Sequence, residues 1–286
     1  MHISFATANL YQEPFEDVLG MIAEAGYDAI ELDLFWERKE WAMAQHLRGW
    51  SAKQIAASIE RSGLRLVSIH DGGGMLDDPE SVAGYINPAL AETIDALGYV
   101  PGCLVFHTPH VEGAQDASWW GRIEGRIAAE LRPYQEICPV VTVENMPNFD
   151  GYRVPLLTPQ ALADFTQRFG LGVNLDTTHY AMMGTDVVVA AGLLHEQVRS
   201  IHLSDFLACQ AHVFVGEGDL DLAGVFAALD NQRLHAVTVE CSLARGNGAV
   251  QPLDRAEKVA RMREAKLRTE AYLKCDYAGL KPLLRT

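Results

Sequence analysis

The chain has 286 residues, 49% of them apolar and 21% charged, which is typical of a globular protein with a large core. Its net charge of −15 disfavours nonspecific binding to nucleic acid or to anionic membranes, because both require clustered lysine and arginine. The longest apolar run, 187–194, is too short to cross a bilayer, and the N-terminus lacks the basic start and apolar stretch of a signal peptide.

The five cysteines are scattered along the chain and form no C-x-x-C pair, which indicates reduced thiols. Cys103, Cys138 and Cys241 lie in or beside apolar runs, so we expect them to be small buried core residues. With no targeting segment evident, a cytoplasmic location is the default expectation.

Strand-like and helix-like segments alternate along the whole chain. Several strand-like runs are continuously apolar, as expected for a parallel sheet covered on both faces. The expected strands are residues 2–7, 28–34, 65–70, 103–107, 140–144, 171–176, 198–204 and 235–240. Eight strands alternating with helices predict an α/β fold with a single (β/α)8 TIM barrel domain over residues 1–286. An open, doubly wound sheet is the alternative.

Several helix ends carry capping residues. Thr158 and Pro159 are expected to be the N-cap and first residue of one helix, and Asp221 is expected to cap another. The last helix is expected to span about 254–273.

Two segments that follow strands, 35–50 and 108–121, are longer than a minimal connection. They contain five tryptophans: Trp36, Trp41, Trp50, Trp119 and Trp120. In a barrel, segments after strands lie on the catalytic face. These side chains therefore either close over a substrate or form a small satellite core beneath a long loop.

Four side chains of metal-ligand type end four successive expected strands: Glu144, Asp176, His202 and Glu240. The carboxyl ends of parallel strands meet at one edge, so the four side chains should converge there. Three carboxylates and an imidazole in one buried place repel each other unless a cation neutralises them. We therefore predict one divalent metal ion. Ligation rich in oxygen suits Mn²⁺ first, and Mg²⁺ or Co²⁺ at least as well as Zn²⁺.

Further polar side chains should face the same barrel mouth. Glu31, His70 and His107 also end expected strands, and His179 follows Asp176 by three residues. For His70 and His107 we place substrate contact ahead of a further metal, and a further metal ahead of core packing. His179 is expected to bind a substrate hydroxyl or a second metal, with a buried structural histidine as the alternative.

The motifs around these residues resemble the xylose isomerase-like TIM barrels. They are VENMP (143–147), DTTH (176–179), HLSD (202–205) and HVFVGEG (212–218), with Glu240 closing the set. That superfamily includes sugar-phosphate isomerases, ketose 3-epimerases, inosose and dehydroshikimate dehydratases, and zinc AP endonucleases. The resemblance covers nearly the whole chain and is weak for substrate.

The resemblance implies a divalent-metal-dependent isomerase or epimerase acting on a small polyhydroxy carbonyl compound such as a ketose, keto sugar or inosose. In the epimerase branch, the positions matching Glu144, Asp176, His202 and Glu240 hold one metal. The two glutamates there also transfer protons on opposite faces of the substrate, through a metal-bound enediolate. A lyase or dehydratase that expels a β-hydroxyl from the same enediolate is the near alternative. A non-enzymatic binding barrel is a further one.

The endonuclease branch is the distant alternative. There, positions matching His70 and His107 ligate a further zinc, and those matching His179 and His212 join a third. This chain has Gln210 where the endonucleases carry an acid, which argues against a trinuclear centre. Many isomerases carry a substrate-binding arginine in the stretch corresponding to 205–212, and none is present here.

The loop after the eighth strand, 242–250, is glycine-rich and holds Arg245. Arg245 either contacts a phosphate or carboxylate of the substrate or lies in a solvated loop. The expected substrate contacts are thus His70, His107, His179, His212, Trp36 and Arg245. The expected partner is a small sugar-like molecule, with no nucleic acid and no membrane, and a homo-oligomer remains open.

Overall fold

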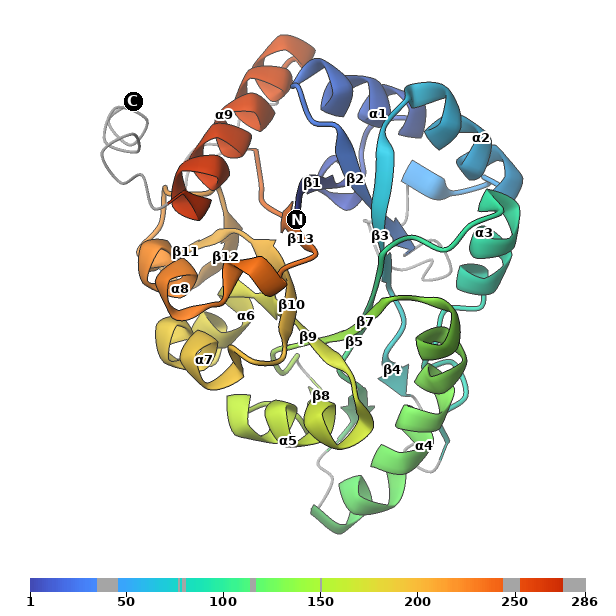
Figure 1. Cartoon of the computed structure of the whole chain (residues 1–286), viewed down its shortest axis with the longest axis vertical. Helices are drawn as coiled ribbons and strands as arrows, with labels where there is room; N and C mark the ends of the chain where they lie inside the picture. The colour runs from blue at the N-terminus through green and yellow to red at the C-terminus, as the bar shows by residue number, and fades with distance from the viewer. Residues whose placement is uncertain are drawn as a thin grey trace.

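Eight parallel strands close into a barrel at the centre of the molecule, and helices surround it (Figure 1). The computed structural model of the protein describes residues 1–34, 46–76, 78, 81–113, 117–149, 151–243 and 253–274. The barrel strands are β1 (His2–Ala6), β2 (Ala29–Leu34), β3 (Arg65–Asp71), β5 (Cys103–His107), β7 (Val140–Glu144), β9 (Gly172–Asp176), β10 (Val198–Leu203) and β13 (Ala236–Val239). Because β1 pairs with both β2 and β13, the sheet is closed. The predicted (β/α)8 barrel is confirmed, and the open sheet is excluded.

The helices that follow Thr158 and Asp221 begin where these capping residues predict, and the last helix begins at Arg255. The described helices are α1 (Phe15–Glu24), α2 (Ala52–Ser62), α3 (Ala89–Leu97), α4 (Ala117–Ile137), α5 (Pro159–Phe169), α6 (Thr177–Met182), α7 (Val187–Leu194), α8 (Leu222–Ala228) and α9 (Arg255–Leu273), with 3-10 turns at Thr7–Leu10 and Asn231–Arg233. Thr158 caps α5 by accepting from the Ala161 amide, and Asp221 caps α8 in the same way. Among the described helices, none combines the length and apolar character needed to cross a membrane.

Two small sheets follow barrel strands and therefore lie on the side where those strands end. One contains β4 (Met75–Leu76), β6 (His110–Glu112) and β8 (Tyr152–Arg153), and the other is the hairpin of β11 (Asp205–Leu207) and β12 (Gln210–Val213). Strands of two to four residues carry too little periodicity to be found from sequence.

The barrel strands are apolar toward the helices and polar toward the barrel axis. Val143, Val173 and Val237 belong to the main core, whereas the adjacent Thr142, Asn174 and Thr238 are polar and buried. The expectation of continuously apolar runs is therefore wrong for these strands. Small side chains, many of them polar, contact one another across the barrel, as Cys103 Sγ does with Ser200 Oγ at 3.9 Å.

Trp119 and Trp120 lie in α4 and belong to the packing between helices. Trp119 is 2% exposed, and the ring of Trp120 lies 5.5 Å from that of Phe165 in α5. For this pair, closure over a substrate is therefore wrong and the core interpretation holds. Trp50 packs edge-on against Phe15, also at 5.5 Å. Trp36 and Trp41 lie outside the described residues.

Three cysteines are buried with free thiols, as expected: Cys103, Cys138 and Cys241. Burial raises the pKa of Cys103 and of Cys241 to about 12, so both thiols stay protonated at neutral pH.

Gly102, which precedes β5, provides a test of the packing at the end of the barrel where the strands begin. A Cβ added at Gly102 would lie 2.2 Å from Cε1 of His235, whose Nε2 is 3.2 Å from the Val67 carbonyl. Gly102→Ala should displace this ring and lower the free energy of unfolding by about 1–3 kcal/mol in urea denaturation. Gly121→Ala is the control, because this exposed glycine of α4 has nothing within 4 Å of the added atom. It should raise the free energy of unfolding by up to about 1 kcal/mol. Equal urea midpoints for the two variants would contradict the close packing of His235 against Gly102.

Candidate metal centre and active site

The barrel register brings Glu144, Asp176, His202 and Glu240, here called the quartet, to one place. His202 lies level with Asp176 on β9 and with Thr238 on β13, and Glu240 is two residues beyond Thr238. Residues i and i+2 of a strand point to the same face, so all these side chains enter the barrel mouth. Each of the four offers one ligand atom, and these atoms lie within 4.8 Å of one another.

The quartet atoms that converge have no hydrogen-bond partner within the described residues. They are Glu144 Oε2, Asp176 Oδ2, His202 Nδ1 and Glu240 Oε2. His202 Nδ1 lies 2.7 Å from Glu240 Oε2 and 3.2 Å from Glu144 Oε2, yet neither contact has hydrogen-bond geometry. Buried polar atoms are normally satisfied, so a cluster of orphaned ones requires an explanation. Three carboxylate oxygens and one imidazole nitrogen around a shared space fit a divalent cation.

Local sequence fixes the carboxylate of Asp176. This residue ends β9 and is the N-cap of α6, so its Oδ1 accepts from the amides of Thr178 at 2.7 Å and His179 at 2.9 Å. The other oxygen of Asp176, Oδ2, is left to face the other three members of the quartet. Asn145 was missed from sequence, although it sits in VENMP. Its amide accepts from Asp176 N at 2.8 Å and donates to Asp176 O at 3.1 Å, which ties β7 to β9 at the site.

His70 and His107 face each other beside Glu144. Their Nε2 atoms are 2.8 Å apart, and His70 Nε2 is 3.2 Å from Glu144 Oε2. His107 Nδ1 lies 3.0 Å from the Gly73 carbonyl, to which it donates. Both side chains are buried and directed to the site, so His70 and His107 can reach a ligand held by the quartet. Ligand atoms of His70, His107 and Glu144 lie within 4.8 Å of one another, close enough to hold a cation as well as a substrate group.

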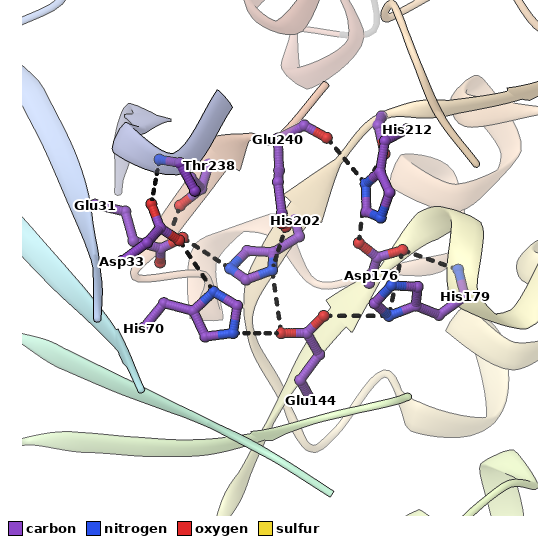
Figure 2. A network of polar contacts seen from close by, with 12 residues as sticks. Glu31, Asp33, His70, Glu144, Asp176, His179, His202, His212, Thr238 and Glu240 are labelled. Atoms are coloured by element: carbon purple, nitrogen blue, oxygen red, sulfur yellow. Dashed lines mark hydrogen bonds and ion pairs between the residues drawn. The ribbon is translucent and has the colours of Figure 1, made fainter. Parts of the chain in front are cut away.

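His179 and His212 form the other flank of the site (Figure 2). His179 Nδ1 is 3.2 Å from Glu144 Oε1 and 3.7 Å from Asp176 Oδ1. His212 Nδ1 is 4.0 Å from Asp176 Oδ2, and its side chain is 35% exposed, so it lies toward solvent. The backbone of His212 has a φ of 53°, a left-handed conformation that few residues other than glycine adopt.

The charges in the cluster compensate one another. Burial opposes protonation of His202, but the carboxylates of Glu31, Glu144 and Glu240 raise its pKa well above the usual value. Burial would likewise raise the pKa of Glu144, but His202 and His70 lower it well below the usual value. Protonated imidazole and ionised carboxylate thus stabilise each other in the metal-free protein.

The remaining histidines divide by their neighbours. Against burial, Asp176 and Glu144 raise the pKa of His179 to about 9. Against burial, Glu144 and Asp33 raise the pKa of His70 well above its usual value. Burial and the adjacent charge of His70 lower the pKa of His107 well below its usual value, so this ring stays neutral.

A family model described as "Xylose isomerase-like TIM barrel" matches residues 19–265. The chain belongs to the xylose isomerase-like TIM barrel family. The match spans most of the barrel, and the resemblance inferred from the motifs is confirmed.

Known proteins similar to the chain share its fold at low identity. "Uncharacterized protein YfiH" of Bacillus subtilis (strain 168) is 24% identical over 236 residues, which cover 72% of this chain and 73% of that protein. The crystal structure of the IolI protein with a binding zinc atom has a TM-score of 0.72 at 15% identity, over 97% of this chain and 100% of that one. D-psicose 3-epimerase with D-tagatose, from Clostridium cellulolyticum H10, has a TM-score of 0.67 at 16% identity, over 96% and 99%.

The remaining polar and aromatic residues near the mouth lie in different places. Gln210 is exposed at the start of β12, where it pairs with Leu207 in the hairpin. His110 is buried and stacks on Phe149 with ring centroids 4.9 Å apart, so its ring forms part of the wall beside the mouth. Trp36 and Arg245 lie outside the described residues.

Metal uptake by this barrel should release protons. At neutral pH, His202 is protonated because its pKa is raised, and a cation must displace that proton from Nδ1. We expect Zn²⁺ or Mn²⁺ binding to release roughly one proton, so that affinity rises about tenfold per pH unit up to the raised pKa of His202. Calorimetry in buffers of different ionisation enthalpy measures this number. Tight binding with no proton release over that range would contradict the raised pKa of His202.

Proposed function

We propose that this protein is a divalent-metal-dependent isomerase or epimerase of a small polyhydroxy carbonyl compound. The observation that carries the proposal is that two glutamates approach His202 Nδ1 from different strands. Glu144 comes from β7 and Glu240 follows β13, and strands β9 and β10 lie between them in the barrel order. A ligand held at the quartet would therefore have the Glu144 carboxylate on one side and the Glu240 carboxylate on the other.

A divalent cation held by the quartet would act as a Lewis acid that acidifies the C–H bond next to a chelated carbonyl. The ionised carboxylate of one glutamate can then accept that proton while the electron pair of the C–H bond forms an enediolate. The other glutamate returns a proton to the opposite face, which epimerises, or a proton goes to the neighbouring carbon, which isomerises. The lowered pKa of Glu144 keeps its carboxylate ionised at neutral pH, which supports a role for Glu144 as proton acceptor.

The surrounding histidines would bind and orient the substrate. Neutral His107 and protonated His70 stand beside Glu144, so they can accept from or donate to substrate hydroxyls. His179, with a pKa of about 9, supplies a positive charge next to Glu144 Oε1. A neutral or weakly charged sugar-like substrate suits this mixture of donors and acceptors. The proposed cation is Mn²⁺ first, with Mg²⁺, Co²⁺ or Zn²⁺ as alternatives.

Deuterium exchange tests the proposed chemistry. The protein loaded with Mn²⁺ is incubated in D2O with ketohexoses, inososes and 3-keto sugars, and recovered substrate is analysed by mass spectrometry and NMR. D-tagatose is a first probe, because a structural neighbour of the chain is described with that sugar. We expect one deuteron at the carbon next to the carbonyl, and loss of exchange when a chelator removes the metal. No exchange across the panel would contradict the proposal for those substrates.

Glu240→Gln tests proton transfer by a named residue. The amide keeps the size of the side chain but cannot accept the proton, so exchange should fall by about 10²–10⁴-fold. Glu196→Gln is the matched control, because Glu196 is exposed and precedes β10, at the opposite end of the barrel. Melting temperature should stay near the wild-type value in both variants. Normal turnover by Glu240→Gln would show that Glu240 is not the proton-transfer group.

Two outcomes of the same experiments would indicate the other reactions. A product lighter by one water would show a dehydratase that uses the same initial proton removal. Three bound ions per chain and cleavage of an abasic DNA duplex would show the endonuclease chemistry, which the net charge of −15 disfavours.

A further inference from the structure

Strand β2 places two buried carboxylates behind the histidines of the site. Glu31 and Asp33 are both fully buried, and neither belongs to the quartet. They are two residues apart on one strand, so both point into the barrel. Figure 2 shows them on the side of His202 and His70 that faces away from Asp176.

Glu31 is anchored through one carboxylate oxygen and presents the other to an imidazole. Its Oε2 accepts from Ser68 Oγ at 2.7 Å and from Thr238 Oγ1 at 3.4 Å. Its Oε1 lies 2.9 Å from Nε2 of His202, an ion-pair contact without hydrogen-bond geometry, and neither atom has a hydrogen-bond partner within the described residues. The other ring nitrogen of His202, Nδ1, is the one that faces the quartet. The imidazole therefore lies between Glu31 and the cation position.

Asp33 repeats this arrangement at the next histidine. Its Oδ2 accepts from the Ala8 amide at 2.8 Å and from Thr7 Oγ1 at 3.0 Å. Its Oδ1 lies 3.2 Å from His70 Nδ1, while His70 Nε2 faces Glu144. In both cases small donors hold one oxygen in place, and the second oxygen faces the ring nitrogen that points away from the site.

We propose that Glu31 and Asp33 are positioning residues that fix where the ring protons of His202 and His70 lie. Glu31 accepts the Nε2 proton of His202 and leaves the Nδ1 lone pair for the cation. Asp33 accepts the Nδ1 proton of His70, whose protonated Nε2 is then held toward Glu144 and the acceptor Nε2 of His107. A carboxylate behind a ligating imidazole fixes its tautomer and raises its basicity, and removing one typically weakens metal binding 10–100-fold. The inference rests on the cation site of the proposed function.

The tautomers are directly measurable in the wild-type protein. With ¹⁵N-labelled histidine and Zn²⁺, which is diamagnetic, long-range ¹H–¹⁵N NMR distinguishes a protonated from a metal-bound ring nitrogen. We expect His202 to carry its proton on Nε2 and zinc on Nδ1, and His70 to carry protons on both Nδ1 and Nε2. This measurement requires no variant, so a variant that fails to fold leaves it intact. Zinc on Nε2 of His202 would overturn the inference.

Two isosteric variants assign each carboxylate to its histidine. Glu31→Gln should weaken Zn²⁺ binding about 10–100-fold in chelator competition and shift the His202 ring signals. Asp33→Asn should shift the His70 signals and leave those of His202 in place. Asp71→Asn is the matched control, because Asp71 is also buried on a neighbouring strand but accepts from the Asn87 amide at 3.0 Å. It should lower stability without changing the zinc affinity or either histidine.

The outcomes separate the inference from the proposed function. Wild-type affinity and unchanged His202 signals in Glu31→Gln would overturn the positioning role while the metal site stands. A wild-type protein that binds neither Zn²⁺ nor Mn²⁺ would overturn the proposed function and the inference with it. Weakened binding with the His202 tautomer lost, against an unchanged Asp71→Asn control, would support the role of Glu31.

Discussion

Buried carboxylates around one imidazole are the constraint on which this structure depends. Glu31, Glu144 and Glu240 all lie within hydrogen-bonding distance of His202, inside a barrel that excludes solvent from three of these four side chains almost completely. Like charges in such a place are unstable unless positive charge is brought among them. In the metal-free protein, protons on the histidines supply that charge, and their raised pKa values are its signature. A cation in the quartet replaces a proton, so metal binding and protonation compete for the same nitrogen.

The alternation of side-chain direction along each strand brings these buried carboxylates together. Thr142 and Glu144 point the same way on β7, as do Thr238 in β13 and Glu240 just after it, while the valines between the members of each pair belong to the outer core. A slip of one residue would bury the valines inside and place the glutamates among the helices. The apolar face that stabilises the barrel and the polar face that forms the site are therefore specified by the same alternation.

Sequence alone could predict the strand-end residues but not their partners. Apolar runs mark the strands, and a parallel barrel brings strand ends together, so the quartet and His70 and His107 were found. Asp33 was missed because nothing in ELDL shows that it lies level with His70, which depends on the register of β2 against β3. Asn145 was missed because its role is to bridge backbone atoms of the neighbouring strand. Trp119 was uncertain because a tryptophan after a strand fits a loop and a helix equally well.

The serine and threonine hydroxyls around Glu31 donate their hydrogen bonds toward it, which suits the proposed role of Glu31. A hydroxyl has one hydrogen to donate. Thr238 Oγ1 donates its hydrogen to Glu31, so the hydrogen of the 2.9 Å contact between Ser4 and Thr238 must come from Ser4. Ser68 adds a second hydrogen to the same carboxylate oxygen. These two donors satisfy Oε2 of Glu31. The other oxygen, Oε1, is therefore left to interact with the ring of His202. A barrel filled with branched apolar side chains offers no such donors, and a buried carboxylate in that position would favour its neutral form.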